Sequence, residues 1–166
     1  MDKAGTLYER DFYAWALGQA EALRRLAETR SNLPLDFENL IDEVEALART
    51  ERAAVLSQLQ RLIEHLLKLE FSSSASPRRG WRITVNNARA EIEDRITPTI
   101  RSGLEPEMAK LFRRARENAV LALLDHGERG SAELVKGCEP GHYRIEQLLD
   151  PSWLPANRHG LVDEPL

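Results

Sequence analysis

The chain has 166 residues, with 23 Lys and Arg against 27 Asp and Glu, which gives a formal net charge of −4. Hydrophobic residues make up 42% and charged residues 30%. This is the composition of an ordinary globular protein, which at this length can bury a hydrophobic core without the help of disulfide bonds or metal ions. These values exclude a collagen-like chain, a disulfide-rich scaffold and a largely disordered protein, and they argue against a general nucleic-acid coat protein.

The first predicted helix covers residues 6–30. Thr6 followed by Glu9 is the pattern of a capping box. Apolar residues then recur at helical spacing and include Tyr8, Phe12 and Trp15. Ser31, Asn32 and Pro34 end the pattern, so we expect a connection there.

The second predicted helix covers residues 36–71, with Asp36 as its N-cap. No proline or glycine interrupts this stretch, which corresponds to about 54 Å at 1.5 Å per residue. Its apolar stripe is interrupted at Glu51 and Arg52. Three explanations are open: the helix bends there, two charges lie in a packed seam, or the second half packs against a different element.

A third helix is predicted over residues 77–96, and Thr97-Pro98 begins a short turn that reaches Gly103. A fourth helix follows Glu105-Pro106 and ends at Gly127. Residues 128–143 are rich in glycine and turn residues, and a short helix covers residues 144–149. We therefore predict an all-α fold: one domain over residues 1–155, a bundle of four principal helices with the short C-terminal helix packed across it, and a tail over residues 156–166.

Charge is distributed unevenly along the predicted helices. Residues 36–51 contain six acids against one arginine, and residues 77–101 contain six arginines against three acids. In one interpretation the arginines of the third helix pack on the acidic half of the second helix. In the other interpretation they face an anionic partner such as nucleic acid, through Arg78, Arg79, Arg82 and Arg89. The balanced overall charge favours the first interpretation.

No spacing in the sequence predicts a metal centre, a cofactor site or a nucleophile motif. The four histidines form neither an H-E-x-x-H nor a repeated Glu-x-x-His pattern, and no glycine-rich phosphate loop is present. We therefore expect no metal and no cofactor. His65 is the most interesting histidine, because Arg61 and Lys68 lie within one helical turn of it and are expected to lower its pKa.

Five segments together resemble the bacterial family catalogued as domain of unknown function 29. They are residues 8–15, 35–52, 65–68, 81–84 and 146–155. The resemblance implies a compact helical bundle but supplies no substrate, cofactor or reaction. The polar residues that fall on the recurring motifs of the family are Asp11, Asn39, Glu43, Glu45, Arg49, Arg52, His65, Lys68, Arg82 and Arg89.

Two classes of function follow from these observations. The first is a non-catalytic interaction or regulatory protein with a protein partner, which includes a homodimer. In this class Arg82, Arg89, Lys68 and Asp11 are the candidate binding residues. The second is an enzyme, such as a nuclease or a metal-dependent hydrolase, that uses His65 with Glu43 or Glu45 and with Arg52, Arg82 or Arg89.

The sequence also predicts where the protein resides. No signal peptide is visible, and the longest apolar run, Ala119–Leu124, is far shorter than the roughly 20 residues that cross a bilayer. We therefore expect a cytoplasmic protein that does not interact with membranes.

Overall fold

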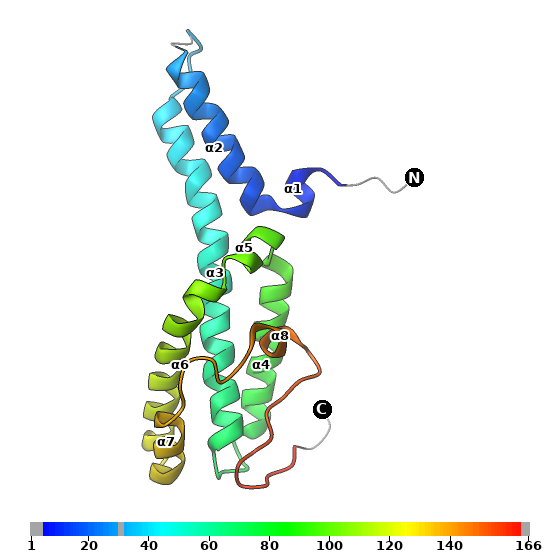
Figure 1. Cartoon of the computed structure of the whole chain (residues 1–166), viewed down its shortest axis with the longest axis vertical. Coiled ribbons are helices and arrows are strands. Elements are labelled where there is room, and N and C mark those ends of the chain that lie inside the picture. Colours follow the sequence, from blue (N-terminus) through cyan, green and yellow to red (C-terminus); the bar gives the residue numbers. More distant parts are fainter. Residues whose placement is uncertain (1–4, 30–31, 164–166) are drawn as a thin grey trace. The chain divides into compact units, whose positions relative to one another are not determined.

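The computed structural model describes residues 5–29 and 32–163, and every regular element in these residues is a helix (Figure 1). The helices are α1 (Leu7–Arg10), α2 (Phe12–Glu28), α3 (Phe37–Phe71), α4 (Arg78–Arg95), α5 (Pro98–Ser102), α6 (Glu105–Asp125), α7 (Arg129–Lys136) and α8 (Ile145–Leu149). The predicted all-α class is confirmed. The arrangement as four principal helices in one bundle stays a prediction.

The first predicted helix is divided in two at Asp11. The Thr6 amide donates to the Glu9 carboxylate at 2.7 Å, as expected for a capping box. Asp11 then leaves helical geometry, with φ −152° and ψ 80°, and its carboxylate accepts a hydrogen bond from the Ala14 amide at 2.9 Å. The chain therefore ends one short helix and caps the next with the same residue. The predicted end of this helix at Arg30 lies outside the described residues.

Helix α7 was not predicted. Residues 128–143 were expected to form turns, but Arg129–Lys136 is helical and packs beside α6 (Figure 1). Ala132 and Val135, three residues apart, are buried on one face of this short helix. Burial of that face outweighs the low helix propensity of Gly130, since tertiary packing commonly overrides propensity.

The chain divides into two compact units that share helix α3. The N-terminal unit contains residues up to 55 and residues 95–103, and the C-terminal unit contains residues 56–94 and those from 104 onward. Helix α3 continues without interruption through Glu51 and Arg52, shortly before the boundary between the units. The second half of α3 thus belongs to a different unit from the first half, in line with the third explanation for the break in its apolar stripe. The prediction of one domain over residues 1–155 stays a prediction.

The two units have different cores. In the N-terminal unit the buried hydrophobic side chains are mostly small: Ala16, Ala20, Ala48, Val55 and Ile100. In the C-terminal unit many are large, and α3 alone contributes Leu59, Leu62, Ile63, Leu66, Leu67 and Leu69. Each fully buried leucine contributes about 1.5–3 kcal/mol, so most of the hydrophobic stabilisation comes from the C-terminal unit.

The segment predicted as a tail is held against the end of α3. The Asn157 side-chain amide donates to the carbonyls of Leu69 and Ser72, each at 2.9 Å. Asp163 accepts two hydrogen bonds from the buried Arg78 guanidinium, at 2.8 and 2.9 Å. Residues 157–163 are therefore part of the C-terminal unit rather than a free tail, while residues 164–166 lie outside the described residues.

Candidate functional sites

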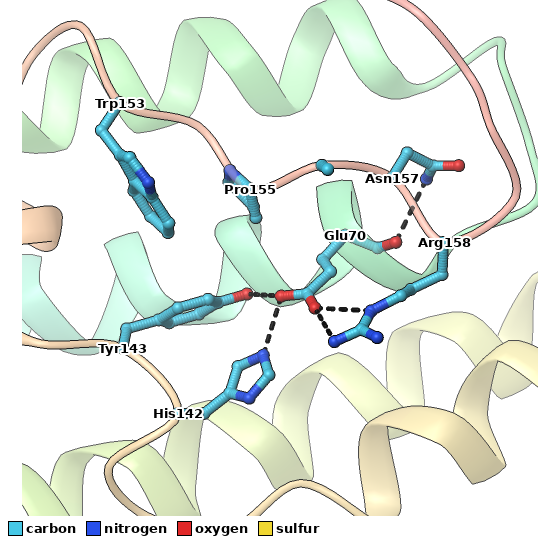
Figure 2. Close-up of a pocket in the computed structure, with 8 residues that line it drawn as sticks. Glu70, His142, Tyr143, Trp153, Pro155, Asn157 and Arg158 are labelled. Carbon is cyan, nitrogen blue, oxygen red and sulfur yellow. Dashed lines mark hydrogen bonds and ion pairs between the residues drawn. The ribbon is translucent and has the colours of Figure 1, made fainter.

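A buried carboxylate, Glu70, forms the centre of a hydrogen-bond network at the C-terminal end of α3 (Figure 2). Its side chain is only 5% exposed. One oxygen accepts from the Tyr143 hydroxyl at 2.7 Å and from His142 Nε2 at 2.8 Å. The other accepts from Arg158 Nε at 2.8 Å. These residues line a pocket of about 330 Å³, whose wall also includes Trp153 and Pro155.

The network keeps Glu70 ionised. Burial by itself raises the pKa of the Glu70 carboxyl, but hydrogen bonds from Tyr143, His142 and Arg158 outweigh it and leave the pKa below its usual value. The same carboxylate acts together with burial to raise the pKa of Tyr143 well above that of a free tyrosine. Tyr143 therefore remains a protonated hydrogen-bond donor, and Glu70 remains an acceptor.

This geometry favours a positioning role for Glu70. Both carboxylate oxygens already accept hydrogen bonds, and the donors come from residues 142–158, while Glu70 lies on α3. Use of Glu70 as a general base or nucleophile would require one of these bonds to break. The arrangement instead fastens the chain that follows α7 to the end of α3.

A second candidate site is an apolar surface on the hairpin formed by α2 and the first half of α3. These two helices lie antiparallel in the N-terminal unit (Figure 1). An ion pair between Arg24 and Glu45 joins them along one side. Two residues along an α-helix correspond to a rotation of about 200°, so residues two positions from this pair lie on the opposite side. Ala22 and Leu26 occupy such positions on α2, and Leu47 does so on α3.

We call this opposite side the leucine face; it comprises Ala22, Leu26, Leu40 and Leu47. Leu40 precedes Leu47 by seven residues and therefore lies on the same helix face. The three leucine residues are 38%, 39% and 52% exposed. They lie beside a buried stripe of alanine residues. Leu17, which is 39% exposed, precedes Arg24 by seven residues and so lies on the side of the ion pair, whereas the leucine face gathers three exposed leucine residues from both helices.

Asp11, a predicted binding residue, is 5% exposed and caps two helices of the N-terminal unit. Besides the Ala14 amide at the start of α2, its carboxylate accepts the Thr99 amide in the first turn of α5 at 2.8 Å. Burial raises the pKa of Asp11, but these hydrogen bonds more than compensate, so the pKa is below its usual value. The structure gives this residue a structural role.

The residues of the enzyme hypothesis are not neighbours along α3. Residues on one helix face adjoin each other at separations of three or four positions, whereas Glu43, Glu45 and Arg52 precede His65 by 13 to 22 positions. They belong to the N-terminal unit and His65 to the C-terminal unit. Glu45 is engaged with Arg24, and Glu43 is exposed to solvent.

His65 and Lys68 form a local cluster on α3. His65 Nδ1 donates to the Arg61 carbonyl at 2.9 Å, and its Nε2 lies 3.4 Å from the Lys68 ammonium. Burial and the charge of Lys68 lower the pKa of His65, in agreement with the sequence analysis. Lys68 itself is 7% exposed, pairs with Glu64 at 2.8 Å and lies over the Trp81 ring. Lys68 is therefore bound within the protein rather than presented to a partner.

Helix α4 does not present Arg78 and Arg89 on its surface. Arg89 is 7% exposed, and its guanidinium donates at 2.9 Å to the Leu148 carbonyl in the last turn of α8 and at 2.9 Å to the Trp153 carbonyl in the segment that follows it. It thus supplies hydrogen bonds that the end of a helix otherwise lacks. Arg82, a further predicted binding residue, is half-buried on the same helix.

The predicted pairing of the arginine-rich segment with the acidic segment is found at one described pair. Arg95 lies 3.3 Å from Glu51, as expected. Arg78, in contrast, binds Asp163 and the Leu69 carbonyl. Arg78 and Arg89 thus bind other parts of the chain, so the predicted pairing with the acidic segment does not hold for these two residues.

The Glu70 network was not predicted from the sequence. One signal was present, because Glu70 lies four residues after Leu66 and so falls on the buried stripe of α3. A charged residue on such a stripe requires partners, since an unpaired buried charge is costly. Its partners lie 72 to 88 residues further along the chain, and no local pattern identifies them.

Two further features of the described residues bear on function. Over residues 5–29 and 32–163, no group of three or more His, Cys, Asp and Glu side chains is arranged to hold a metal ion. Among the described helices, none combines the length and apolar character that a membrane span requires.

Fold and sites together define a small all-helical protein with an anchored C-terminal segment and an exposed leucine face. The chain belongs to the family described as Domain of unknown function DUF29, whose model matches residues 7–154. It is similar to a crystal structure of an alpha-helical protein of unknown function from Rhodospirillum rubrum, with a TM-score of 0.77 and 25% identity over 90% of this chain and 92% of the other. No curated protein matches the chain.

Proposed function

We propose that this protein is a non-catalytic interaction protein of the bacterial cytoplasm that binds a protein partner through the leucine face. The observation that carries this proposal is the exposure of Leu26, Leu40 and Leu47 on one side of the α2–α3 hairpin. Single exposed leucine residues are common, but adjacent ones on two helices form the kind of apolar patch that marks interaction sites. An amphipathic helix of a partner, or a pair of helices, fits such a surface.

The charged residues give less support to the enzyme alternative. Glu45 is paired with Arg24, Lys68 with Glu64, and the Arg89 guanidinium is occupied by backbone carbonyls. Catalysis by these groups would require a cleft on which they converge, and Glu45, Lys68 and Arg89 each bind a different group of the protein. The Glu70 site is likewise occupied by its own donors.

Capture of partners from the native host tests the proposal. The full chain is compared with Leu47→Glu, which places a charge in the leucine face, and with the matched control Leu121→Glu. Leu121 is 66% exposed on α6 of the C-terminal unit and lies outside the leucine face. We expect the yield of specific partners, further copies of the chain included, to fall at least about tenfold for Leu47→Glu only. Equal yields for the chain and for Leu47→Glu would refute a partner at this face.

A further inference from the structure

We infer that the partner at the leucine face is a second copy of this chain. In the pair, α2 of each copy packs on α3 of the other, and the two hairpins form a four-helix arrangement. This inference rests on the proposed function and makes it more specific. Two observations support it: the leucine faces of two copies are complementary in the sizes of their side chains, and they are complementary in charge.

The Arg24–Glu45 ion pair places residues 24 and 45 at about the same level along the two antiparallel helices. Counting from that pair in opposite directions along the antiparallel helices, Ala22 is level with Leu47, and Leu26 is level with Glu43. A twofold axis parallel to the helices preserves these levels and exchanges α2 with α3. The small Ala22 then faces the large Leu47 of the second copy. Leu26 enters the space between Leu40 and Leu47 of the second copy.

This alternation of small and large side chains is how helices interdigitate in bundles. With a twofold axis perpendicular to the helices, α2 would meet α2, and Ala22 and Leu26 would not face the leucine residues of α3. The distribution of side-chain sizes therefore selects the axis that is parallel to the helices. Because the same surface serves both copies, the contact closes as a dimer and does not propagate.

Charge at the edges of the face supports the same axis. Arg25 lies on the outer edge of α2, one residue beyond Arg24; its side chain is 76% exposed, and its Nε lies 3.2 Å from Glu21, one turn earlier on the same helix. Glu43 lies on the outer edge of α3, four residues before Leu47, and is exposed. Their levels differ by about one residue, so in the pair Arg25 of each copy meets Glu43 of the other. Opposite charges thus flank the apolar contact on both edges.

The size of the face predicts a reversible dimer. Three half-exposed leucine residues per copy form a contact at the small end of specific interfaces, for which we expect a dissociation constant in the micromolar range, about 1–100 µM. Sedimentation velocity of the purified full chain, over about 1 µM to 1 mM, covers this range.

A charge exchange tests the inference. Arg25→Glu places two acids at each edge of its own dimer, and Glu43→Arg places two arginines there. Each variant alone should dimerise about tenfold more weakly than the chain, because two exposed pairs become repulsive. An equimolar mixture of the two variants restores an opposite pair at both edges and should recover the original affinity. Leu47→Glu should be monomeric, and the matched control Leu121→Glu should dimerise like the chain.

Three results would overturn the inference: a monomeric chain at about 1 mM, a mixture no stronger than either variant alone, or a Leu47→Glu chain that still dimerises. Circular dichroism verifies that each variant is folded. A monomeric chain whose captured partner is nevertheless lost in Leu47→Glu would remove the second copy and leave the proposed function intact. The proposed function itself fails if Leu47→Glu captures as much partner as the unmodified chain.

Discussion

Replacement of Glu70 by Gln should destabilise the C-terminal unit substantially. The change keeps the shape of the side chain but removes its charge. It also directs an amide group at donors: either at the Arg158 guanidinium, or at the Tyr143 hydroxyl and His142 Nε2 together. Hydrogen bonds to a charged group contribute about 1.5–3 kcal/mol each, and the lower desolvation cost of the neutral amide offsets part of the loss. We expect a net loss of about 2–4 kcal/mol in the free energy of unfolding.

For a chain of this size, that loss corresponds to a decrease of about 5–12 °C in Tm. Urea titration followed by tryptophan fluorescence and by far-UV circular dichroism measures the free energy of unfolding, and thermal melting measures Tm; one of the three tryptophan residues, Trp153, borders the Glu70 pocket. Glu133→Gln, which removes an exposed carboxylate from α7, is the matched control and should change stability by less than about 0.5 kcal/mol. If the Tm of Glu70→Gln lies within about 2 °C of the Tm of the unmodified chain, the central role of this carboxylate is refuted.

The effect of Glu70 should also depend on pH. Because its pKa is lower in the folded chain than in the unfolded chain, its contribution is fully present above the unfolded pKa. That contribution is lost as the pH falls through the folded pKa. The difference in stability between the chain and Glu70→Gln should therefore be constant near neutral pH and shrink below about pH 4. An equal difference at pH 7 and pH 3 would contradict this account.

Three further predictions use other groups. Asp11→Ala removes the cap of α2 and an acceptor in the first turn of α5 and should cost about 2–3 kcal/mol by urea titration, whereas Asp11→Asn, which keeps one acceptor oxygen and so only one of the two hydrogen bonds, should cost about half as much. Arg89→Met leaves carbonyls at the end of α8 without donors and should cost about 2–4 kcal/mol by the same assay; an unchanged midpoint would show that water replaces the guanidinium. Burial raises the pKa of the Cys138 thiol to about 11, so alkylation at pH 8 should be at least about 100-fold slower in the folded chain than in urea, and equal rates would refute its burial.

Most of the helices could be predicted from the sequence because their signals are local. The long apolar stripe that ends at Phe71 marks α3. The proline residues at positions 77, 98 and 106 lie at or next to the first residues of α4, α5 and α6. Helix α7 was missed, since its eight residues include a glycine and its apolar face is stabilised only by packing on α6. The break at Asp11 was missed because one carboxylate caps two helices, and the second of them begins 87 positions later in the sequence.

The candidate site could not be predicted for a related reason. Charge counts indicated that the arginine residues of α4 need acceptors, but the sequence does not specify which ones. Arg78 and Arg89 instead bind Asp163 and the carbonyls beyond α8, where backbone and side chains converge only after folding. The leucine face could not be predicted because it depends on which face of each helix is buried. Packing of α2 and α3 through alanine residues left the leucine residues exposed.

The anchoring of residues 157–163 bears on where this protein can be shortened. The family match ends at residue 154, but the carbonyls at the end of α3 receive hydrogen bonds from Asn157 and His159, and Glu70 receives them from Arg158. A chain cut at the family boundary loses all of these donors at once: Glu70 keeps His142 and Tyr143 but loses the arginine that binds its other oxygen, and several carbonyls at the end of α3 lose their donors. The foldable unit thus extends beyond the stretch by which the family is recognised, and a minimal version of this protein has to include residue 163.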